Sequence, residues 1–393
     1  MPTAADVTTT LQRQFYRHDD HGTMITPPAT LGILGGGQLG RYFVIAARAM
    51  GYGTVVLEPD LHAPAGQVAD EHIVAAFDDE SALKHLAELC AVVTTEFENP
   101  PAAAMQLLSL HTAVQPSASA VAIAQDRRTE RAFLRDAGVP QAPYQLIETD
   151  DDVDIAADFH YPAILKTARL GYDGKGQVAV ASPADLNDAW LQLNRQPCVL
   201  EQRLLLDGEV SVVLARSARG ETATYPVAHN THVNGILDCT VVPYVTKGAT
   251  DLAVAIAAAL DYVGVLAVEM FIVDGHLLVN ELAPRPHNSG HWTLNAARTS
   301  QFEQQVRAVC GVGLGDPSMT VPAVAMVNLL GDLWADGEPD WSVALADRAA
   351  SLHLYGKTMP RPGRKMGHIT VTGPTPEEAV QRAMAIRSDL TAR

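Results

Sequence analysis

The clearest hydrophobic pattern in the chain is a pair of apolar segments between Val265 and Ala283, joined at Asp274-Gly275. Two short apolar runs on either side of an Asp-Gly pair predict a β-hairpin. Each predicted strand carries one acidic residue among apolar neighbours, Glu269 in the first and Glu281 in the second. Burying a carboxylate without a partner is unfavourable, so each acid needs a cation or a hydrogen-bond donor.

Neither predicted strand contains a basic residue that could neutralise these two acids. Hard oxygen ligands suit Mg²⁺, so Glu269 and Glu281 are candidate metal ligands. The length of the turn determines whether the side chains of Glu269 and Glu281 face each other. A two-residue turn places Glu269 opposite Asn280, whereas a three-residue loop or a bulge places it opposite Glu281, because a slip of one residue reverses the face of every side chain. The alternative interpretation is an edge hairpin with both acids in water.

The segment from residue 30 to residue 58 predicts a strand, a glycine-rich turn, a helix and a second strand, which is the βαβ opening of an α/β fold. Gly35, Gly37 and Gly40 match G-x-G-x-x-G, and Glu58 ends the second strand where a ribose-binding acid would lie. Taken alone, this pattern predicts a dinucleotide site and an NAD-dependent dehydrogenase. A lone fingerprint is weak, because the same turn binds other phosphates or packs a strand on a helix.

The α/β pattern continues toward residue 137. A predicted strand over 91–95 ends beside Glu96 and Glu98, at the end of the strand where α/β folds bind ligands. Acids that cap the next element explain the pattern equally well. Helices are expected over 102–109 and 118–137.

A glycine-rich hairpin dominates the middle of the chain. The apolar strand over 161–166 ends in Lys166, and the loop after it carries Gly171, Gly174 and Gly176 around Lys175. Glycines let backbone N–H groups approach phosphate oxygens, and the lysine adds positive charge. No G-K-[ST] opens a helix here, so the loop is not a Walker loop. A plain β-turn is the alternative.

A further apolar run over 199–204, with Glu201, is typical of an edge strand that holds a flat base through its backbone.

After residue 316 the pattern predicts a smaller C-terminal domain, with strands over 323–330, 350–354 and 365–371 and a last helix over 376–390. Against a net charge of −17, the basic loop of this domain predicts a phosphate site rather than a solvated loop. Its cations are Lys357, Arg361, Arg364 and Lys365.

Composition narrows the class of protein. With 393 residues, 47% of them hydrophobic, the chain can form two or three domains. No run of 18 apolar residues predicts a membrane span, and the negative charge argues against nucleic-acid binding. The four cysteines lack metal-ligand spacing and are expected to be buried, reduced thiols. Residues 1–28 predict a disordered extension without a signal peptide, so a cytoplasmic location is expected.

Six motifs occur in order from about residue 30 to the C-terminus: GGGQLG, EFEN, K-T-x-x-x-GYDGKGQ, EQ…GEVS, NELAPRPHNSGHWT and GKxxPRxGRKMGH. Each is weak alone, but the ordered set resembles 5-(carboxyamino)imidazole ribonucleotide synthetase, an ATP-grasp carboxylase of purine biosynthesis. The resemblance implies a homodimer with three parts in each chain. They are a Rossmann-like domain over 29–126, an ATP-grasp domain over 127–315 and a small β-rich C-terminal domain over 316–393.

The resemblance also implies a role for individual residues. Mg²⁺ would be bound by Glu269 and Glu281. ATP would be held by Arg127, Lys166, the loop Gly171, Tyr172, Asp173, Gly174, Lys175, Gly176 and Gln177, the adenine-binding residues Glu201, Gln202, Arg203 and Leu204, the ribose-binding Glu209, and His232 and Asn280. The aminoimidazole ribonucleotide and bicarbonate would contact Tyr172, Asp173, Lys175, Arg285, His287, Asn288, Lys357 and Arg364. Lys175 stands where the family also carries arginine, which keeps the charge but not a bidentate contact.

The implied reaction is the carboxylation of aminoimidazole ribonucleotide by bicarbonate and ATP, through carboxyphosphate. Its catalytic residues would be Asp173, Lys166, Lys175 and Arg285, with Asp173 accepting the proton of the amine and Lys166 neutralising developing charge. Three alternatives remain open: a formate-dependent transformylase on a nucleotide precursor, an NAD-dependent dehydrogenase and a non-catalytic nucleotide-binding module. The dehydrogenase leaves Glu269, Glu281 and the basic loop unexplained.

Overall fold

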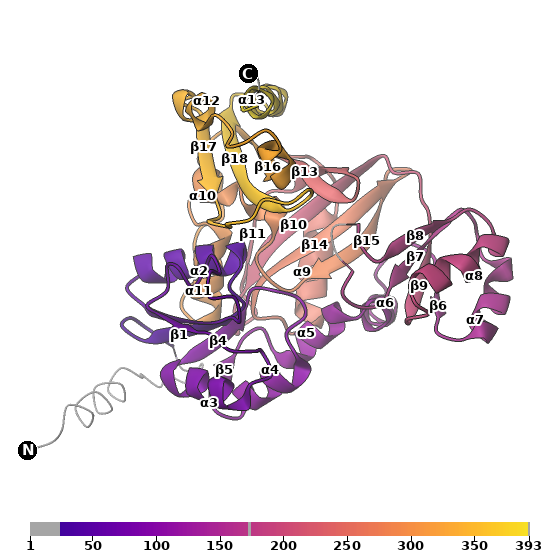
Figure 1. Ribbon diagram of the computed structural model, residues 1–393, viewed down its shortest axis with the longest axis horizontal. Helices are drawn as coiled ribbons and strands as arrows, with labels where there is room; N and C mark the ends of the chain where they lie inside the picture. Colours follow the sequence, from indigo (N-terminus) through magenta and orange to yellow (C-terminus); the bar gives the residue numbers. More distant parts are fainter. Residues whose placement is uncertain (1–23, 172–173, 392–393) are drawn as a thin grey trace, which may run out of the picture.

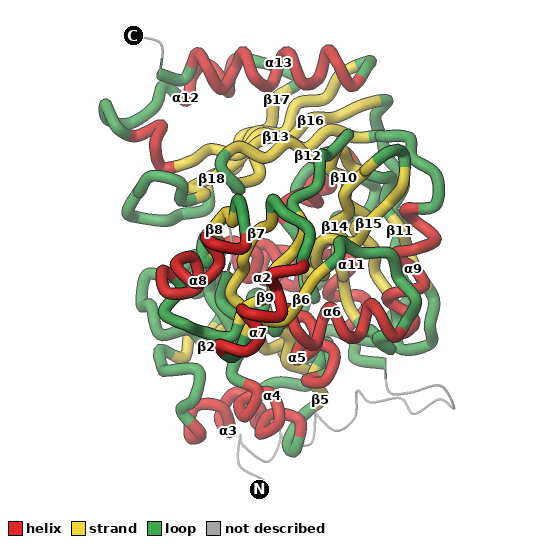
Figure 2. The backbone as a smooth tube through the Cα atoms, turned by 90° about the vertical axis from the view of Figure 1, so that its right-hand side faces the viewer, coloured by secondary structure: helices red, strands yellow, loops and turns green. Residues whose placement is uncertain are grey.

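The computed structural model describes residues 24–171 and 174–391. Its strands form three sheets, and Figure 1 shows the N-terminal part and a small four-stranded lobe on opposite sides of a large central sheet. Figure 2 shows how the strands of the large sheet run beneath the C-terminal helix α13 (Pro376–Asp389).

The N-terminal part is a parallel sheet of five strands in the order β3-β2-β1-β4-β5, as the βαβ pattern predicts. Helix α2 buries Phe43 and Val44 against β1 and β2, which places the glycine-rich turn at the carboxyl end of β1. The elements are β1 (Thr30–Leu34), α2 (Gln38–Ala49), β2 (Gly53–Leu57), β3 (Glu71–Ile73), α3 (Glu80–Leu89), β4 (Val92–Thr95), α4 (Ala102–Ser109) and β5 (Ala113–Val114).

Part of the expected N-terminal extension is packed. The side chain of Ile25 is buried, and its backbone N–H donates to the carbonyl of Cys310 at 2.8 Å. The expectation of disorder is therefore wrong for residues 24–28, because Ile25 fills an apolar site between the N-terminal sheet and helix α11 (Gln301–Val309). Residues 1–23 lie outside the described part of the chain.

The single helix expected over 118–137 is two helices, α5 (Ala118–Gln125) and α6 (Arg127–Asp136). Between them Asp126 has an extended backbone, with φ −125° and ψ 115°, and its carboxylate accepts the N–H of Arg128. An aspartate in this conformation is a favourable N-cap, so a new helix begins at Arg127. The break places Arg127 in the first turn of α6, where its side chain can extend away from the body of the helix.

The small lobe holds an antiparallel sheet in the order β6-β9-β7-β8, with helices α7 and α8 packed on it. Strand β9 lies between β6 and β7, so the expectation of an edge strand at 199–204 is wrong. Of the residues expected in this edge strand, those after Gln202 lie beyond the end of β9 and are outside the sheet. The elements are β6 (Tyr144–Ile147), α7 (Asp150–Ile155), β7 (Ala163–Thr167), β8 (Gln177–Val180), α8 (Pro183–Gln192) and β9 (Cys198–Gln202).

The large sheet has nine strands, and the C-terminal strands extend it because β16 pairs with β13. Its order is β15-β14-β10-β12-β13-β16-β18-β17, with β11 beside β10. The elements are β10 (Gly208–Arg216), β11 (Thr222–Thr224), β12 (Ala228–Val233), β13 (Ile236–Val242), α9 (Ala249–Ala259), β14 (Gly264–Val273), β15 (His276–Ala283), α10 (Thr293–Ala296), β16 (Ala323–Leu330), α12 (Trp341–Ala346), β17 (Ala350–Leu354) and β18 (Lys365–Gly373).

The four cysteines are free and buried, as expected. Across residues 24–171 and 174–391, none of the helices combines the length and the apolar character that crossing a membrane would require.

Candidate active site

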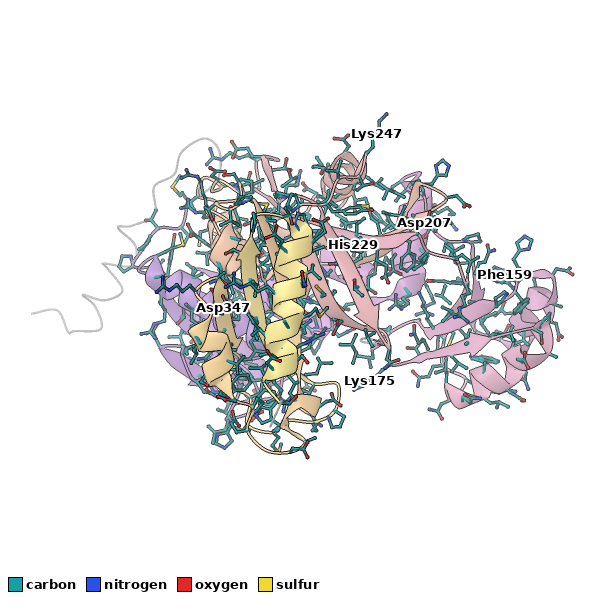
Figure 3. All side chains as sticks on the ribbon, turned by 90° about the horizontal axis from the view of Figure 1, so that it is seen from above. Phe159, Lys175, Asp207, His229, Lys247 and Asp347 are labelled. Atoms are coloured by element: carbon teal, nitrogen blue, oxygen red, sulfur yellow. The ribbon has the colours of Figure 1, made fainter. Side chains whose placement is uncertain are left out.

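A cavity of about 980 Å³ lies where the small lobe, the large sheet and the N-terminal part meet. Figure 3 places Lys175 on the small lobe, on the side that faces the rest of the molecule. Predicted site residues on the cavity wall are Arg127, Lys166, Gly171, Gly174, Lys175, Gln177, Arg203, Glu209, His232, Glu269, Asn280, Glu281, Arg285, His287 and Asn288. The structure therefore brings together residues that are spread from Arg127 to Asn288 in the sequence.

The acidic hairpin has a two-residue turn and a bulge. Asp274 and Gly275 both have positive φ, 50° and 74°, which is the backbone of a tight hairpin turn. The register runs from Val273 opposite His276 to Met270 opposite Val279, and then shifts. Past the shift, Glu269 faces Glu281, because Asn280 is the extra residue on β15.

Helix α6 holds this bulge in place. The guanidinium of Arg131 donates to the carbonyl oxygen of Asn280 at 2.5 Å, and Glu130 accepts the N–H of Leu282 at 2.7 Å. These bonds satisfy backbone groups at the bulge from outside the sheet. The alternative of a hairpin with both acids in water is wrong for Glu269, which is only 9% exposed.

The bulge leaves three hard oxygen groups on one side of the cavity. Oδ1 of Asn280 is buried and has no hydrogen-bond partner among the described residues. Glu281 lies 3.3 Å from Arg127, and Glu269 lies 3.1 Å from Nε2 of His287. Two carboxylates and an unpartnered amide oxygen fit a hard divalent cation such as Mg²⁺.

The electrostatics of the two carboxylates agree with a site built for a cation. Burial and the negative charge of Glu281 raise the pKa of Glu269. Burial alone would also raise the pKa of Glu281, but Arg127 and Lys166 lower it. Two acids that face each other in this way repel until a cation lies between them.

Lys166 and Arg131 converge on Glu201, inside the interface between the small lobe and α6. Glu201 Oε2 lies 2.5 Å from Lys166 Nζ, and Oε1 accepts from Arg131 at 2.8 and 3.0 Å. Burial alone would raise the pKa of Glu201, but the charges of Lys166 and Arg131 lower it to about 2. Glu201 is therefore an ionised anchor for Lys166, and its side chain is not free to contact a base.

The glycine loop contributes backbone to the cavity. Gly174 and Gly176 have positive φ, 76° and 70°, and a Cβ on Gly176 would lie 2.5 Å from Oγ1 of Thr167. Glycine is thus required at both positions. Tyr172 and Asp173 lie outside the described residues. Of the predicted adenine-binding residues, Arg203 lines the cavity, whereas Gln202 and Leu204 do not.

Glu209 and His232 form a pair on neighbouring strands, with 3.0 Å between Oε2 of Glu209 and Nδ1 of His232. Burial alone would lower the pKa of His232, but Glu209 and the charge of Glu269 raise it. Both residues line the cavity, and their contact with the ribose of ATP stays a prediction.

The predicted substrate residues approach the cavity from the segment after β15. The guanidinium of Arg285 pairs with Glu98 of the N-terminal part. The side chain of Asn288 exchanges two hydrogen bonds with that of Asn328 in β16, at 2.8 and 3.0 Å. Arg285 and Asn288 are therefore both held in fixed positions by groups from other elements.

The basic loop reaches the cavity through Lys365, the first residue of β18. The ammonium group of Lys357 donates to the carbonyl oxygen of Lys365 at 2.8 Å. The same nitrogen lies 5.5 Å from the centre of the Tyr355 ring. Arg364 donates to the carbonyl of Met359. Neither Lys357 nor Arg364 is on the cavity wall, and their role at a phosphate stays a prediction.

The glycine fingerprint of the N-terminal part is already occupied by carboxylates. Glu58 accepts the N–H of Gly36 at 2.8 Å, and Glu96 accepts those of Gly37 and Gly40 at 2.7 and 2.9 Å. A dinucleotide phosphate would need these same donors. Glu58 is therefore not a ribose ligand, and the dehydrogenase hypothesis is wrong.

Sequence reasoning missed several residues that shape the site. They are Glu130, Arg131, Ser211, Ser289 and Asn328. Glu130 and Arg131 fall in the helical segment whose break was not recognised, although two charged residues beside an N-cap are a usable signal. Ser211 and Asn328 lie in apolar runs and Ser289 lies in a polar segment, and in none of the three cases does the local sequence indicate the hydrogen-bond partner.

Comparisons with known proteins agree with this geometry. Residues 28–125 match a ribonucleotide synthetase preATP-grasp domain, residues 132–302 an ATP-grasp domain and residues 324–382 a phosphoribosylaminoimidazole carboxylase C-terminal domain. The chain is 44% identical over 365 residues to the N5-carboxyaminoimidazole ribonucleotide synthase of Bacillus subtilis, covering 91% of this chain and 95% of that one. For the synthase of Brucella melitensis the identity is 46%, over 88% and 97%.

Solved structures give the same result. The ADP complex of an N5-carboxyaminoimidazole ribonucleotide synthetase superposes with a TM-score of 0.87 at 41% identity, covering 94% of this chain and 99% of that one. A synthase from Aspergillus clavatus in complex with ADP and 5-aminoimidazole ribonucleotide gives 0.82 at 30% identity, over 92% and 98%.

The fold and the cavity define an ATP-grasp enzyme, an ATP-dependent ligase with a preATP-grasp domain before the ATP-grasp domain. Among these enzymes, the chain belongs to the N5-carboxyaminoimidazole ribonucleotide synthase family, which confirms the resemblance of the six motifs.

Proposed function

We propose that the chain catalyses the carboxylation of 5-aminoimidazole ribonucleotide by bicarbonate, with hydrolysis of ATP to ADP and phosphate. The product is N5-carboxyaminoimidazole ribonucleotide, an intermediate of purine biosynthesis. The observation that carries the proposal is the single cavity that joins Lys166, the facing pair Glu269 and Glu281, and Lys365. The related Aspergillus clavatus structure contains ADP and 5-aminoimidazole ribonucleotide together.

Mg²⁺ is the proposed metal, held by Glu269, Glu281 and Asn280. When bound, it would neutralise charge on the phosphates of ATP. In the structure Arg127 lies 3.3 Å from Glu281, and Lys166 lies 2.5 Å from Glu201. Both cations can therefore pair with phosphate oxygens by a small side-chain movement, which orients the nucleotide.

The chemistry begins with attack of a bicarbonate oxygen on the γ-phosphorus of ATP. The new O–P bond gives carboxyphosphate as the bond to ADP breaks, and Lys166 and Lys175 stabilise the charge that develops. Arg285, held by Glu98, can bind the carboxylate end. The amine of the ribonucleotide then attacks this carbon and phosphate leaves. Asp173, outside the described residues, remains the proposed acceptor of the amine proton.

Phosphate release from ATP tests the function directly. We expect fast release only when both aminoimidazole ribonucleotide and bicarbonate are present, because carboxyphosphate needs bicarbonate and its productive use needs the amine. Formate in place of bicarbonate tests the transformylase alternative. Release that follows formate, or ATP binding without any turnover, would contradict the proposal.

Lys357→Ala tests whether the basic loop holds the 5′-phosphate of the ribonucleotide. A charge-assisted phosphate contact contributes about 1.5–3 kcal/mol, or on the order of 10–100-fold in affinity. We expect the KM for aminoimidazole ribonucleotide to rise by that factor while the KM for ATP stays nearly constant. The control is Arg348→Ala, which removes an exposed cation of the same domain.

Equal changes in both KM values would show that Lys357 supports the packing around Lys365 instead of the substrate. The riboside without its 5′-phosphate gives a second check. It should bind the wild type poorly and be almost insensitive to the substitution.

A homodimer and a cytoplasmic location complete the proposal. Both come from the family resemblance and the composition. Analytical ultracentrifugation of the full chain tests the dimer, and a single species of 42 kDa at all concentrations would contradict it.

A further inference from the structure

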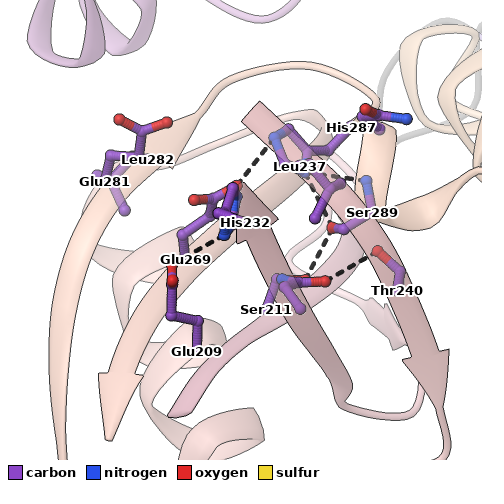
Figure 4. Close-up of polar contacts among 12 residues, drawn as sticks. Glu209, Ser211, His232, Leu237, Thr240, Glu269, Glu281, Leu282, His287 and Ser289 are labelled. Atoms are coloured by element: carbon purple, nitrogen blue, oxygen red, sulfur yellow. Dashed lines mark hydrogen bonds and ion pairs between the residues drawn. The ribbon is translucent and has the colours of Figure 1, made fainter. Parts of the chain in front are cut away.

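A chain of hydrogen-bonded side chains runs from Glu269 along the buried side of the large sheet (Figure 4). Beyond Glu269 its members, in order, are His287, Ser289, Ser211, Asn230 and Thr240. Ser289, Ser211 and Thr240 have no exposed surface, and Asn230 is 3% exposed. The proposed reaction gives no function to these four polar residues, and burying them requires that each of their bonds be satisfied.

The backbone N–H of Ser289 fixes the direction of this chain. It lies 3.3 Å from Nδ1 of His287, and an amide N–H can only donate, so Nδ1 accepts. The proton of a neutral imidazole must then sit on Nε2. Because Nε2 lies 3.1 Å from Oε1 of Glu269, His287 donates to that carboxylate.

The remaining directions follow one from another. The hydroxyl of Ser289, 2.9 Å from Nδ1, must donate to it, so it accepts from the hydroxyl of Ser211 at 2.8 Å. Ser211 has then used its only proton and accepts from the amide nitrogen of Asn230 at 2.9 Å. This orients the amide, and its oxygen accepts from Thr240 at 2.9 Å. Every bond from Thr240 to Glu269 points the same way.

We propose that Thr240, Asn230, Ser211 and Ser289 form a positioning device that holds His287 as the Nε2–H tautomer, so that His287 orients the carboxylate of Glu269 for the metal. With Oε1 held by His287, the other oxygen of Glu269 is left for a cation. The opposite tautomer would turn a lone pair toward the carboxylate and repel it. Hydrogen bonds to the ligands of a metal tune its affinity in this way.

This role differs from the substrate contact that the family resemblance implies for His287. The effect on metal binding rests on the proposed role of Glu269 as a Mg²⁺ ligand. The tautomer does not depend on the metal, so it can be tested separately in metal-free protein.

The tautomer is measured by NMR of ring-¹⁵N-labelled histidine in the full chain without nucleotide or metal. We expect an unprotonated Nδ1 and a protonated Nε2 for His287, identified by the resonance that His287→Gln removes. In Ser289→Ala the 2.9 Å bond from the hydroxyl is lost and only the weaker 3.3 Å bond from the backbone N–H still favours an unprotonated Nδ1, so the fraction of the Nδ1–H tautomer should rise above that of the wild type. Ser217→Ala is the matched control, because Ser217 is a buried, hydrogen-bonded serine just after β10.

The NMR result can overturn the proposal on its own. A protonated Nδ1 in the wild type would do so whatever the protein's function. An unchanged tautomer in Ser289→Ala would show that the buried hydroxyls do not hold it.

Mn²⁺ binding with a non-hydrolysable ATP analogue, followed by electron paramagnetic resonance, tests the effect on the metal. We expect Ser289→Ala to lower the affinity on the order of tenfold, within the range of about 10–100-fold for such partners, and Ser217→Ala to leave it unchanged. His287→Gln places an amide nitrogen near Nε2, whereas His287→Asn places one near Nδ1. The glutamine variant should therefore retain far more affinity.

Equal losses in the glutamine and asparagine variants, or none in Ser289→Ala, would overturn the positioning role while leaving the proposed reaction intact. Absence of Mn²⁺ binding in the wild type would contradict the proposed metal site and this inference together.

Discussion

Glu281→Gln should lower ATP turnover by roughly 100- to 1,000-fold, the range found when one preorganised electrostatic group is removed from a reaction centre. The substitution keeps the shape of the side chain and removes the charge that faces Glu269 across the bulge. A carboxylate is a much stronger ligand for a hard cation than an amide, so Mg²⁺ should bind more weakly. The measurement is phosphate release against Mg²⁺ concentration, and excess Mg²⁺ should restore part of the rate.

The control for Glu281→Gln is Glu221→Gln, which makes the same change at an exposed position beside β11. Its turnover should equal that of the wild type. Circular dichroism should show folded protein in both variants, because the hairpin is held by α6 and by its own ladder. Normal Mg²⁺-dependent turnover in Glu281→Gln would remove Glu281 from the metal site.

The hairpin shows how far the sequence predicts the site. The acids among apolar residues and the Asp-Gly turn indicate two strands and a metal, from local information alone. Whether Glu269 meets Glu281 depends on the bulge at Asn280, and the bulge is held by Glu130 and Arg131 of α6. These partners lie about 150 residues earlier, so no local pattern contains the register.

Two incorrect predictions, a dinucleotide site at Gly35 to Gly40 and an edge strand over 199–204, have the same cause. The fingerprint Gly35 to Gly40 has the sequence of a dinucleotide turn, and its backbone donors are filled by Glu58 and Glu96 from other strands. The run with Glu201 has the composition of an edge strand, and the later strand order places it inside its sheet. Local sequence gives the element in each case, whereas the function of the element is set by what packs against it.

The family motifs supplied what the local patterns could not. Arg285 and Asn288 have no distinguishing pattern of their own, yet both line the cavity with the other candidate residues. Lys357 and Arg364 show the reverse. Their charge was visible in the sequence, but Lys365 is the residue of this loop that reaches the cavity wall, because β18 begins there.

Glu201→Gln should destabilise the protein by about 3–5 kcal/mol, the cost of removing one partner from a buried ion pair. The substitution leaves Arg131, which is 1% exposed, and Lys166 without their carboxylate. Urea unfolding without nucleotide, followed by circular dichroism, measures the loss. The matched control is Asp150→Asn, which removes the acid of the exposed pair with Arg195 and should hardly change the midpoint.

A double-mutant cycle with Arg131→Met separates the ion pair from packing. With the arginine already absent, Glu201→Gln should lower the free energy of unfolding by much less.

The difference in unfolding free energy between the wild type and Glu201→Gln should also change with pH, and in one direction only. The pKa of Glu201 falls from 4.5 to about 2 on folding, so its contribution is complete above pH 4.5 and is lost as the pH falls toward 2. A difference that stays constant from pH 7 to pH 3, or equal losses in both backgrounds, would show that Glu201 acts through packing rather than through its charge.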